Sequence, residues 1–189
     1  MEEAKLRIAS IDAAINGRCG LHDMMAEEFG YLQLRLLCEI IALGCLVAHG
    51  DITRLNLDKL SREYNADAMI KNLEKLHAEF YPHPVVMTVV PRISVHMEPN
   101  KSGFLTKQEL LSLYGRTGNY LHRGKLKTLK SKPPYTHVDL PLIAQWNQKI
   151  IELLTTHHIR SFDNKQHWLC ILKNADDNNH VQVALAKAP

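Results

Sequence analysis

The sequence predicts an α+β fold, in which a mainly helical bundle carries a small antiparallel β element and a C-terminal β-hairpin. Apolar residues recur at helical spacing over most of residues 1–155. β-Branched residues concentrate near residues 84–97, and two alternating runs separated by an Asp/Asn turn fill residues 166–187. A chain of 189 residues with 46% hydrophobic content is long enough to bury a core. We therefore expect residues 1–189 to form a single domain.

Two N-terminal helices follow from the apolar spacing. The first is predicted by Ala4, Ile8, Ile11 and Ile15, with Asn16-Gly17 as its stop. The second is predicted from His22 or Asp23 to about Ala48. Its middle is apolar nearly all round, which is typical of the central helix of a bundle.

Capping residues mark the remaining helices. Short helices are expected after Asn56 and after Asn65, the second ending at Tyr81-Pro82. Thr106 and Glu109 form a capping-box pattern, and Asp139 caps a last helix. The prolines near residues 84–97 predict an edge strand or a bend there, and residues 125–137 read as a loop.

The cysteine spacing and the longest apolar run indicate which cofactors and which cellular compartment to expect. The four cysteines are widely spaced and form no CxxC pair, so neither a disulfide framework nor a zinc site is expected. No cofactor and no metal are predicted. The apolar run 36–48 contains Glu39 and is shorter than the roughly 20 residues that span a bilayer. We expect a cytoplasmic protein without a membrane segment.

The stretch YGRTGNYLHRGKLK, residues 114–127, suggests phosphate chemistry. A histidine transfers protons near neutral pH, and an arginine holds a phosphate oxygen. Arg116 and His122 would together suit metal-free RNA cleavage by the 2′-hydroxyl. In an unbroken helix they would lie about 120° apart. We expect Gly115 and Gly118 to loosen or end the helix so that the two side chains converge.

The charged residues around Arg116 and His122 are all basic. No acid occurs between Glu109 and Asp139. The candidate nucleic-acid-binding residues in this segment are Tyr120, Arg123, Lys125, Lys127, Lys130 and Lys132. The segment 116–132 is either a footprint for a polyanion or an ordinary solvated basic face.

The spacing Arg116-x5-His122, late in the helical part and after a long helix with an embedded acid, resembles the R-x(4–6)-H signature of the HEPN superfamily. The resemblance covers about residues 20–155. It implies a small, often dimeric helical bundle, and many members are metal-independent ribonucleases of toxin–antitoxin or phage-defence systems. It also implies catalytic roles for Arg116 and His122 in a cleft between two protomers. A second match, Arg160-x6-His167, lies in a less favourable context.

Three residues are candidates for a supporting role: Glu39, Thr117 and Asn119. Glu39 either pairs with Arg35, one turn earlier, or orients Arg116 or His122 across the bundle. The first functional hypothesis is an RNA-directed endoribonuclease acting as a homodimer. The alternative is a non-catalytic interaction module, such as an antitoxin, regulator or accessory protein, that binds a protein or nucleic acid. A third hypothesis is a structural protein in which the motif is a coincidence.

Overall fold

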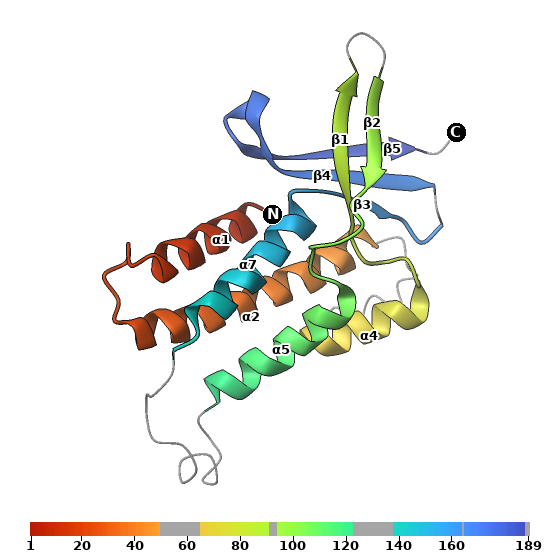
Figure 1. Ribbon diagram of the computed structural model, residues 1–189. Coiled ribbons are helices and arrows are strands. Elements are labelled where there is room, and N and C mark those ends of the chain that lie inside the picture. The colour runs from red at the N-terminus through yellow and green to blue at the C-terminus, as the bar shows by residue number, and fades with distance from the viewer. Residues whose placement is uncertain (50–64, 91–93, 123–137, 164, 188–189) are drawn as a thin grey trace.

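The computed structural model describes residues 1–49, 65–90, 94–122, 138–163 and 165–187 (Figure 1). Its helices are α1 (Glu2–Ile15), α2 (Asp23–Ala48), α4 (Ala66–Leu76), α5 (Lys107–Leu121) and α7 (Leu140–Leu154). Its strands are β1 (His83–Val90), β2 (Ser94–Pro99), β3 (Thr156–Arg160), β4 (Gln166–Asn174) and β5 (His180–Lys187), with the short 3-10 helix η1 (Ala175–Asp177) between the last two. The predicted α+β class is confirmed.

The five strands form one antiparallel sheet in the order β2-β1-β3-β4-β5. The predicted C-terminal hairpin is β4 and β5, and the predicted element near residues 84–97 is the hairpin of β1 and β2. Strand β3 joins the two hairpins, and it is not among the predicted strands. Only His83 and Pro84 of β1 pair with β3, so most of the β1–β2 hairpin extends away from the rest of the sheet (Figure 1).

Helix α2 is the centre of the helical layer. It contacts α1, α4, α5 and α7, and the sheet lies at one end of these helices (Figure 1). Its core residues include Leu34, Leu37, Cys38, Ile41 and Cys45, all at most 4% exposed. Gly30 lets α7 approach closely, since a Cβ there would lie 2.9 Å from two side-chain atoms of Ile143. The prediction of a central helix is confirmed.

The helix boundaries agree with the predicted caps except at the end of α4. Asn65 caps α4 by accepting the backbone N–H groups of Asp67 and Ala68, as predicted. The helix ends at Leu76, five residues before the predicted stop. The segment that follows is held by tertiary contacts instead, because Phe80 is fully buried and Tyr81 donates its hydroxyl to the Leu105 carbonyl (3.0 Å). The short helix expected after Asn56 and the loop at 125–137 lie outside the described residues.

Helix α2 also has the length and composition of a membrane-spanning helix, the only such helix within the described ranges. Its 26 residues exceed the dozen-residue run on which the expectation of no membrane span rests. Half of its most apolar window is buried inside the fold, however, as in the core helix of a soluble protein. The structure is therefore compatible with a soluble protein.

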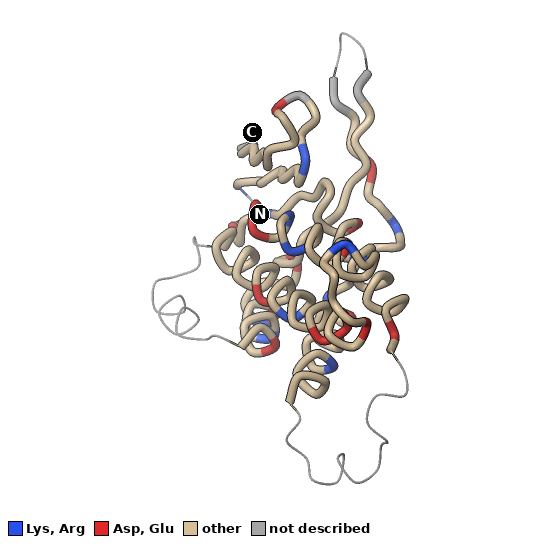
Figure 2. The backbone as a smooth tube through the Cα atoms, turned by 90° about the vertical axis from the view of Figure 1, so that its left-hand side faces the viewer, with Lys and Arg blue, Asp and Glu red and all other residues tan. Residues whose placement is uncertain are grey.

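Basic and acidic residues are interspersed along the helices (Figure 2). Many form ion pairs, including Lys5–Glu2, Arg7–Glu3, Lys71–Asp67, Lys107–Glu74 and Lys149–Glu109. Exposed pairs of this kind contribute little to stability, typically about 0–1 kcal/mol. The one-signed segment predicted from the sequence lies mostly at 123–137, outside the described residues.

Candidate functional site

Helix α5 carries Arg116, while His122 stands at its C-terminal end. The predicted capping box fixes its start, because Thr106 Oγ1 accepts the backbone N–H of Glu109 (3.3 Å) and the Glu109 carboxylate accepts that of Thr106 (3.0 Å). The buried face consists of Leu110, Leu113, Tyr114 and Thr117. Arg116 and His122 are both exposed.

The two glycines do not interrupt α5, which runs as one helix to Leu121. Arg116 and His122 therefore keep the angular separation of about 120° expected of an unbroken helix. The backbone N–H of His122 still donates to the Gly118 carbonyl (3.0 Å). The expectation that the glycines end the helix is wrong, because the buried side chains on either side of them hold α5 against α2.

His122 lines a pocket of about 320 Å³ between α2, α4 and α5. We call it the Arg35–His122 pocket. It is lined by Arg35, Asn65, Asp67, Leu111, Tyr114, Gly115, Gly118, Asn119 and His122. Two predicted site residues, His122 and Asn119, therefore meet here. Arg116 is not among the lining residues. The arginine that lines the pocket is Arg35 of α2.

Arg35 is held by Glu39 and Tyr114. Its Nη2 donates to the Tyr114 hydroxyl (2.7 Å), its Nε lies 3.4 Å from Glu39 Oε1, and its guanidinium carbon lies 4.2 Å from the centre of the Tyr114 ring. The Tyr114 hydroxyl in turn donates to Glu39 Oε1 (3.3 Å). The predicted Arg35–Glu39 pair is confirmed. Burial raises the pKa of Tyr114, an effect that Arg35 opposes.

Glycine at position 118 allows Arg35 to lie close to the backbone of α5. A Cβ on Gly118 would lie 3.1 Å from Nη1 of Arg35, and beyond the adjoining backbone of α5 no other heavy atom of the described residues comes within 4 Å of it. Nη1 has no hydrogen-bond partner among the described side chains and backbone. Arg35 thus brings a cationic group to the pocket that His122 also lines.

Thr117 and Tyr120 are not among the residues that line the pocket, and Tyr120 connects α5 to α2. Thr117 is fully buried and donates to the Tyr114 carbonyl (2.8 Å). The Tyr120 ring stacks on Tyr31 at a centroid distance of 4.1 Å, and its hydroxyl donates to Glu27 (2.7 Å). Burial raises the pKa of the Tyr120 hydroxyl, and the Glu27 carboxylate raises it further. In the monomer these contacts occupy the faces of Tyr120 that point to α2.

The remaining predicted residues are separated from this pocket or lie beyond the described chain. Arg123, Lys125, Lys127, Lys130 and Lys132 lie outside the described residues. In the second sequence match, Arg160 and His167 are directly paired across β3 and β4. Within the described ranges no three His, Cys, Asp or Glu side chains are placed to hold a metal ion.

The Arg35–His122 pocket gathers a guanidinium, an imidazole and the amides of Asn65 and Asn119. Such groups can bind phosphate oxygens, and the imidazole can transfer a proton. Sequence reasoning treated Arg35 only as a partner of Glu39. Comparison with family models, curated proteins and solved structures found no match to this chain.

Proposed function

We propose that the protein is an RNA-directed, HEPN-like endoribonuclease that works without a metal ion at the Arg35–His122 pocket. The observation that carries the proposal is the position of His122, an exposed imidazole on the wall of a pocket that also contains Arg35 and Asn119. We further propose a cytoplasmic homodimer in a toxin or phage-defence setting, in which Arg116 of each protomer faces the other.

The proposed reaction is an internal transesterification of RNA. The 2′-hydroxyl oxygen attacks the adjacent phosphorus, the bond from phosphorus to the 5′-oxygen breaks, and a 2′,3′-cyclic phosphate remains. One proton leaves the 2′-hydroxyl and one is added to the departing 5′-oxygen, and His122 performs one of these transfers. Arg35 stabilises the negative charge that develops on the phosphate oxygens.

We expect His122→Ala to reduce cleavage at least about 100-fold, because a positioned general acid or base contributes on this order or more. Wild type and variant are incubated with a mixed single-stranded and structured RNA pool in excess EDTA, and 2′,3′-cyclic ends are counted. His180→Ala removes an exposed histidine on β5 and is the matched control. Cleavage that persists in His122→Ala, or wild-type cleavage that occurs only when EDTA is left out, contradicts the proposal.

Substituting Arg35 and Arg116 one at a time tests which of them is the cation that binds the phosphate. Arg35→Gln is expected to lower the cleavage rate more than Arg116→Gln if a single protomer supplies the phosphate-binding cation. The opposite order would assign that role to Arg116 and to a site shared by two protomers. Thermal unfolding of both variants controls for the loss of the Arg35–Tyr114 hydrogen bond.

One observation favours the alternative of a non-catalytic module. Arg35 is already paired with Glu39, and Asp67, which also lines the pocket, is paired with Lys71, so these charges are largely balanced. If the folded protein does not cleave RNA, the prediction is binding through the basic segment. Joint replacement of Lys125, Lys127 and Lys130 by Gln would then weaken binding and reduce its salt dependence.

A further inference from the structure

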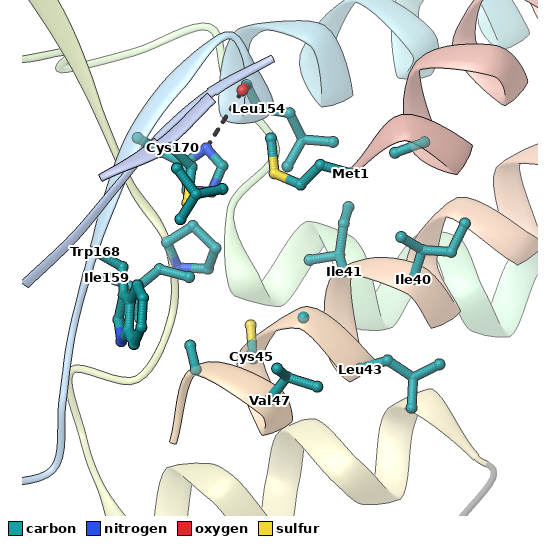
Figure 3. Close-up of a pocket in the computed structure, with 16 residues that line it drawn as sticks. Met1, Ile40, Ile41, Leu43, Cys45, Val47, Leu154, Ile159, Trp168 and Cys170 are labelled. Carbon is teal, nitrogen blue, oxygen red and sulfur yellow. Dashed lines mark hydrogen bonds between the residues drawn. The ribbon is translucent and has the colours of Figure 1, made fainter. Parts of the chain in front are cut away.

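A larger and chemically different pocket lies between the C-terminal half of α2 and the sheet (Figure 3). We call it the sheet pocket. Its volume is about 480 Å³, within the roughly 300–1,000 Å³ range of small-molecule sites. It shares no lining residue with the Arg35–His122 pocket. Ile41 and Cys45 of α2 lie on one side, and Ile159, Trp168 and Cys170 of the sheet lie on the other (Figure 3).

The pocket has a buried floor and an apolar rim. Cys45 is fully buried, and Ile41 and Ile159 are at most 5% exposed. At the rim, Leu43 is 46% and Val47 is 80% exposed. Leaving such side chains in water is unfavourable by roughly 25 cal/mol per Å² of apolar surface. An apolar molecule seated against them would remove that surface from water.

Among the described residues, no Asp, Glu, Lys or Arg side chain lines the sheet pocket. Its titratable side chains are His157, Cys45 and Cys170. The His157 Nδ1 lies 3.3 Å from the Leu154 carbonyl, and burial lowers the pKa of its ring to about 4, so the imidazole is neutral at pH 7. Burial also raises the pKa of both thiols, which stay protonated. The charge that the structure places near these groups is the α-amino group of Met1, which lowers the pKa of His157 and of Cys170. A charged group buried among the apolar side chains would lose its hydration, which is costly.

Glycine at position 44 keeps the α2 side of the pocket open. A Cβ added at Gly44 would meet no heavy atom of the described residues within 4 Å, although Gly44 lines the pocket within a helix. A larger side chain there would occupy the pocket without displacing the core. In a helix interior, replacing Gly also improves helix propensity by up to about 1 kcal/mol.

We propose that the sheet pocket binds a small uncharged hydrophobic molecule, such as a neutral lipid chain or an aromatic compound. The apolar side chains of the lining and the buried floor favour this occupant over an ion or a sugar. A second copy of the chain fits less well, because 16 residues line the pocket, whereas stable interfaces use about 20–30 residues a side. This site is independent of the proposed ribonuclease activity.

The test measures binding of diphenylhexatriene, an uncharged apolar dye whose fluorescence rises in apolar surroundings. We expect saturable binding to the full-length wild type, and at least about tenfold weaker binding to Gly44→Leu. Gly44→Leu is also expected to unfold at the same or a higher temperature, which separates a blocked pocket from a damaged fold. Ala9→Leu adds the same side chain at an exposed position of α1 and is expected to bind like the wild type.

A competition experiment tests the charge of the ligand. Decanol is expected to displace the dye at lower concentration than decanoate at pH 8, because a carboxylate is costly to bury among apolar side chains. Equal dye binding by Gly44→Leu and wild type would overturn the proposal, as would equal displacement by decanol and decanoate. Absent dye binding, together with a dimer that Gly44→Leu converts to a monomer, would show that a second copy covers the pocket instead.

Discussion

Replacing Leu37 by alanine is expected to lower the free energy of unfolding by about 2–5 kcal/mol. Leu37 is fully buried on the face of α2 that forms the centre of the core. The substitution removes three buried carbon atoms and leaves a cavity that close-packed neighbours fill only in part. Because α2 contacts four helices, the neighbours cannot all relax toward the cavity. The measurement is the urea unfolding midpoint at pH 7.5, at which His157 is neutral.

Leu32→Ala is the matched control, because it makes the same chemical change on the same helix at a position that is 42% exposed. Its expected effect is within about 0.5 kcal/mol, as is usual for surface substitutions. The pair also tests the role of α2, which has the length and composition of a membrane span. Equal and small effects of both substitutions would argue against the buried position of Leu37 in a soluble fold.

The helices were predictable because their signals are local. The capping box at Thr106 and Glu109, the cap at Asn65 and the stop at Gly17 each depend on residues within one helical turn. Gly17 has a φ of +71°, a conformation that glycine adopts without strain. The β4–β5 hairpin was predictable for the same reason, since its two strands are adjacent in the chain.

Strand β3 was not predicted because the strand β1, with which it pairs, lies far from it in the sequence. Its five residues, Thr156–Arg160, contain two histidines and show no clear alternation by themselves. They pair with β1, more than 70 residues earlier, and with β4. The two hairpins therefore belong to one sheet, which neither hairpin's own sequence indicates. Pairing of this kind is a tertiary effect that overrides local propensity.

The candidate site was predictable in part for a similar reason. The position of His122 at the end of a helix follows from local sequence, whereas Arg35, which lines the same pocket, lies 87 residues earlier in the chain. One weak signal for Arg35 was available, namely an arginine one turn before the embedded acid Glu39. The small residue Gly118, which admits Arg35, could be assigned only once the packing of α2 on α5 was known.

Acidification is expected to destabilise the protein at pH values well above those at which carboxylates titrate. Burial lowers the pKa of His157 to about 4 from the ordinary 6.5, so below pH 6.5 the unfolded chain binds a proton that the folded protein does not. The contribution of His157 to stability is therefore complete above pH 6.5 and decreases as the pH falls toward 4. Between pH 7 and pH 5 the expected loss is about 2 kcal/mol. His158, whose pKa burial also lowers to about 4, adds a smaller loss because its side chain is partly exposed.

Urea unfolding of wild type and His157→Gln at pH 7 and pH 5 measures this contribution. The variant cannot take up the proton, so its free energy of unfolding should change less between the two pH values, whatever its absolute stability. His96→Gln removes an imidazole that is 64% exposed, and it should keep the wild-type pH dependence. If His157→Gln and wild type lose the same stability on acidification, the imidazole is protonated in the folded protein. The inference that the side chains lining the sheet pocket are neutral would then be wrong for His157.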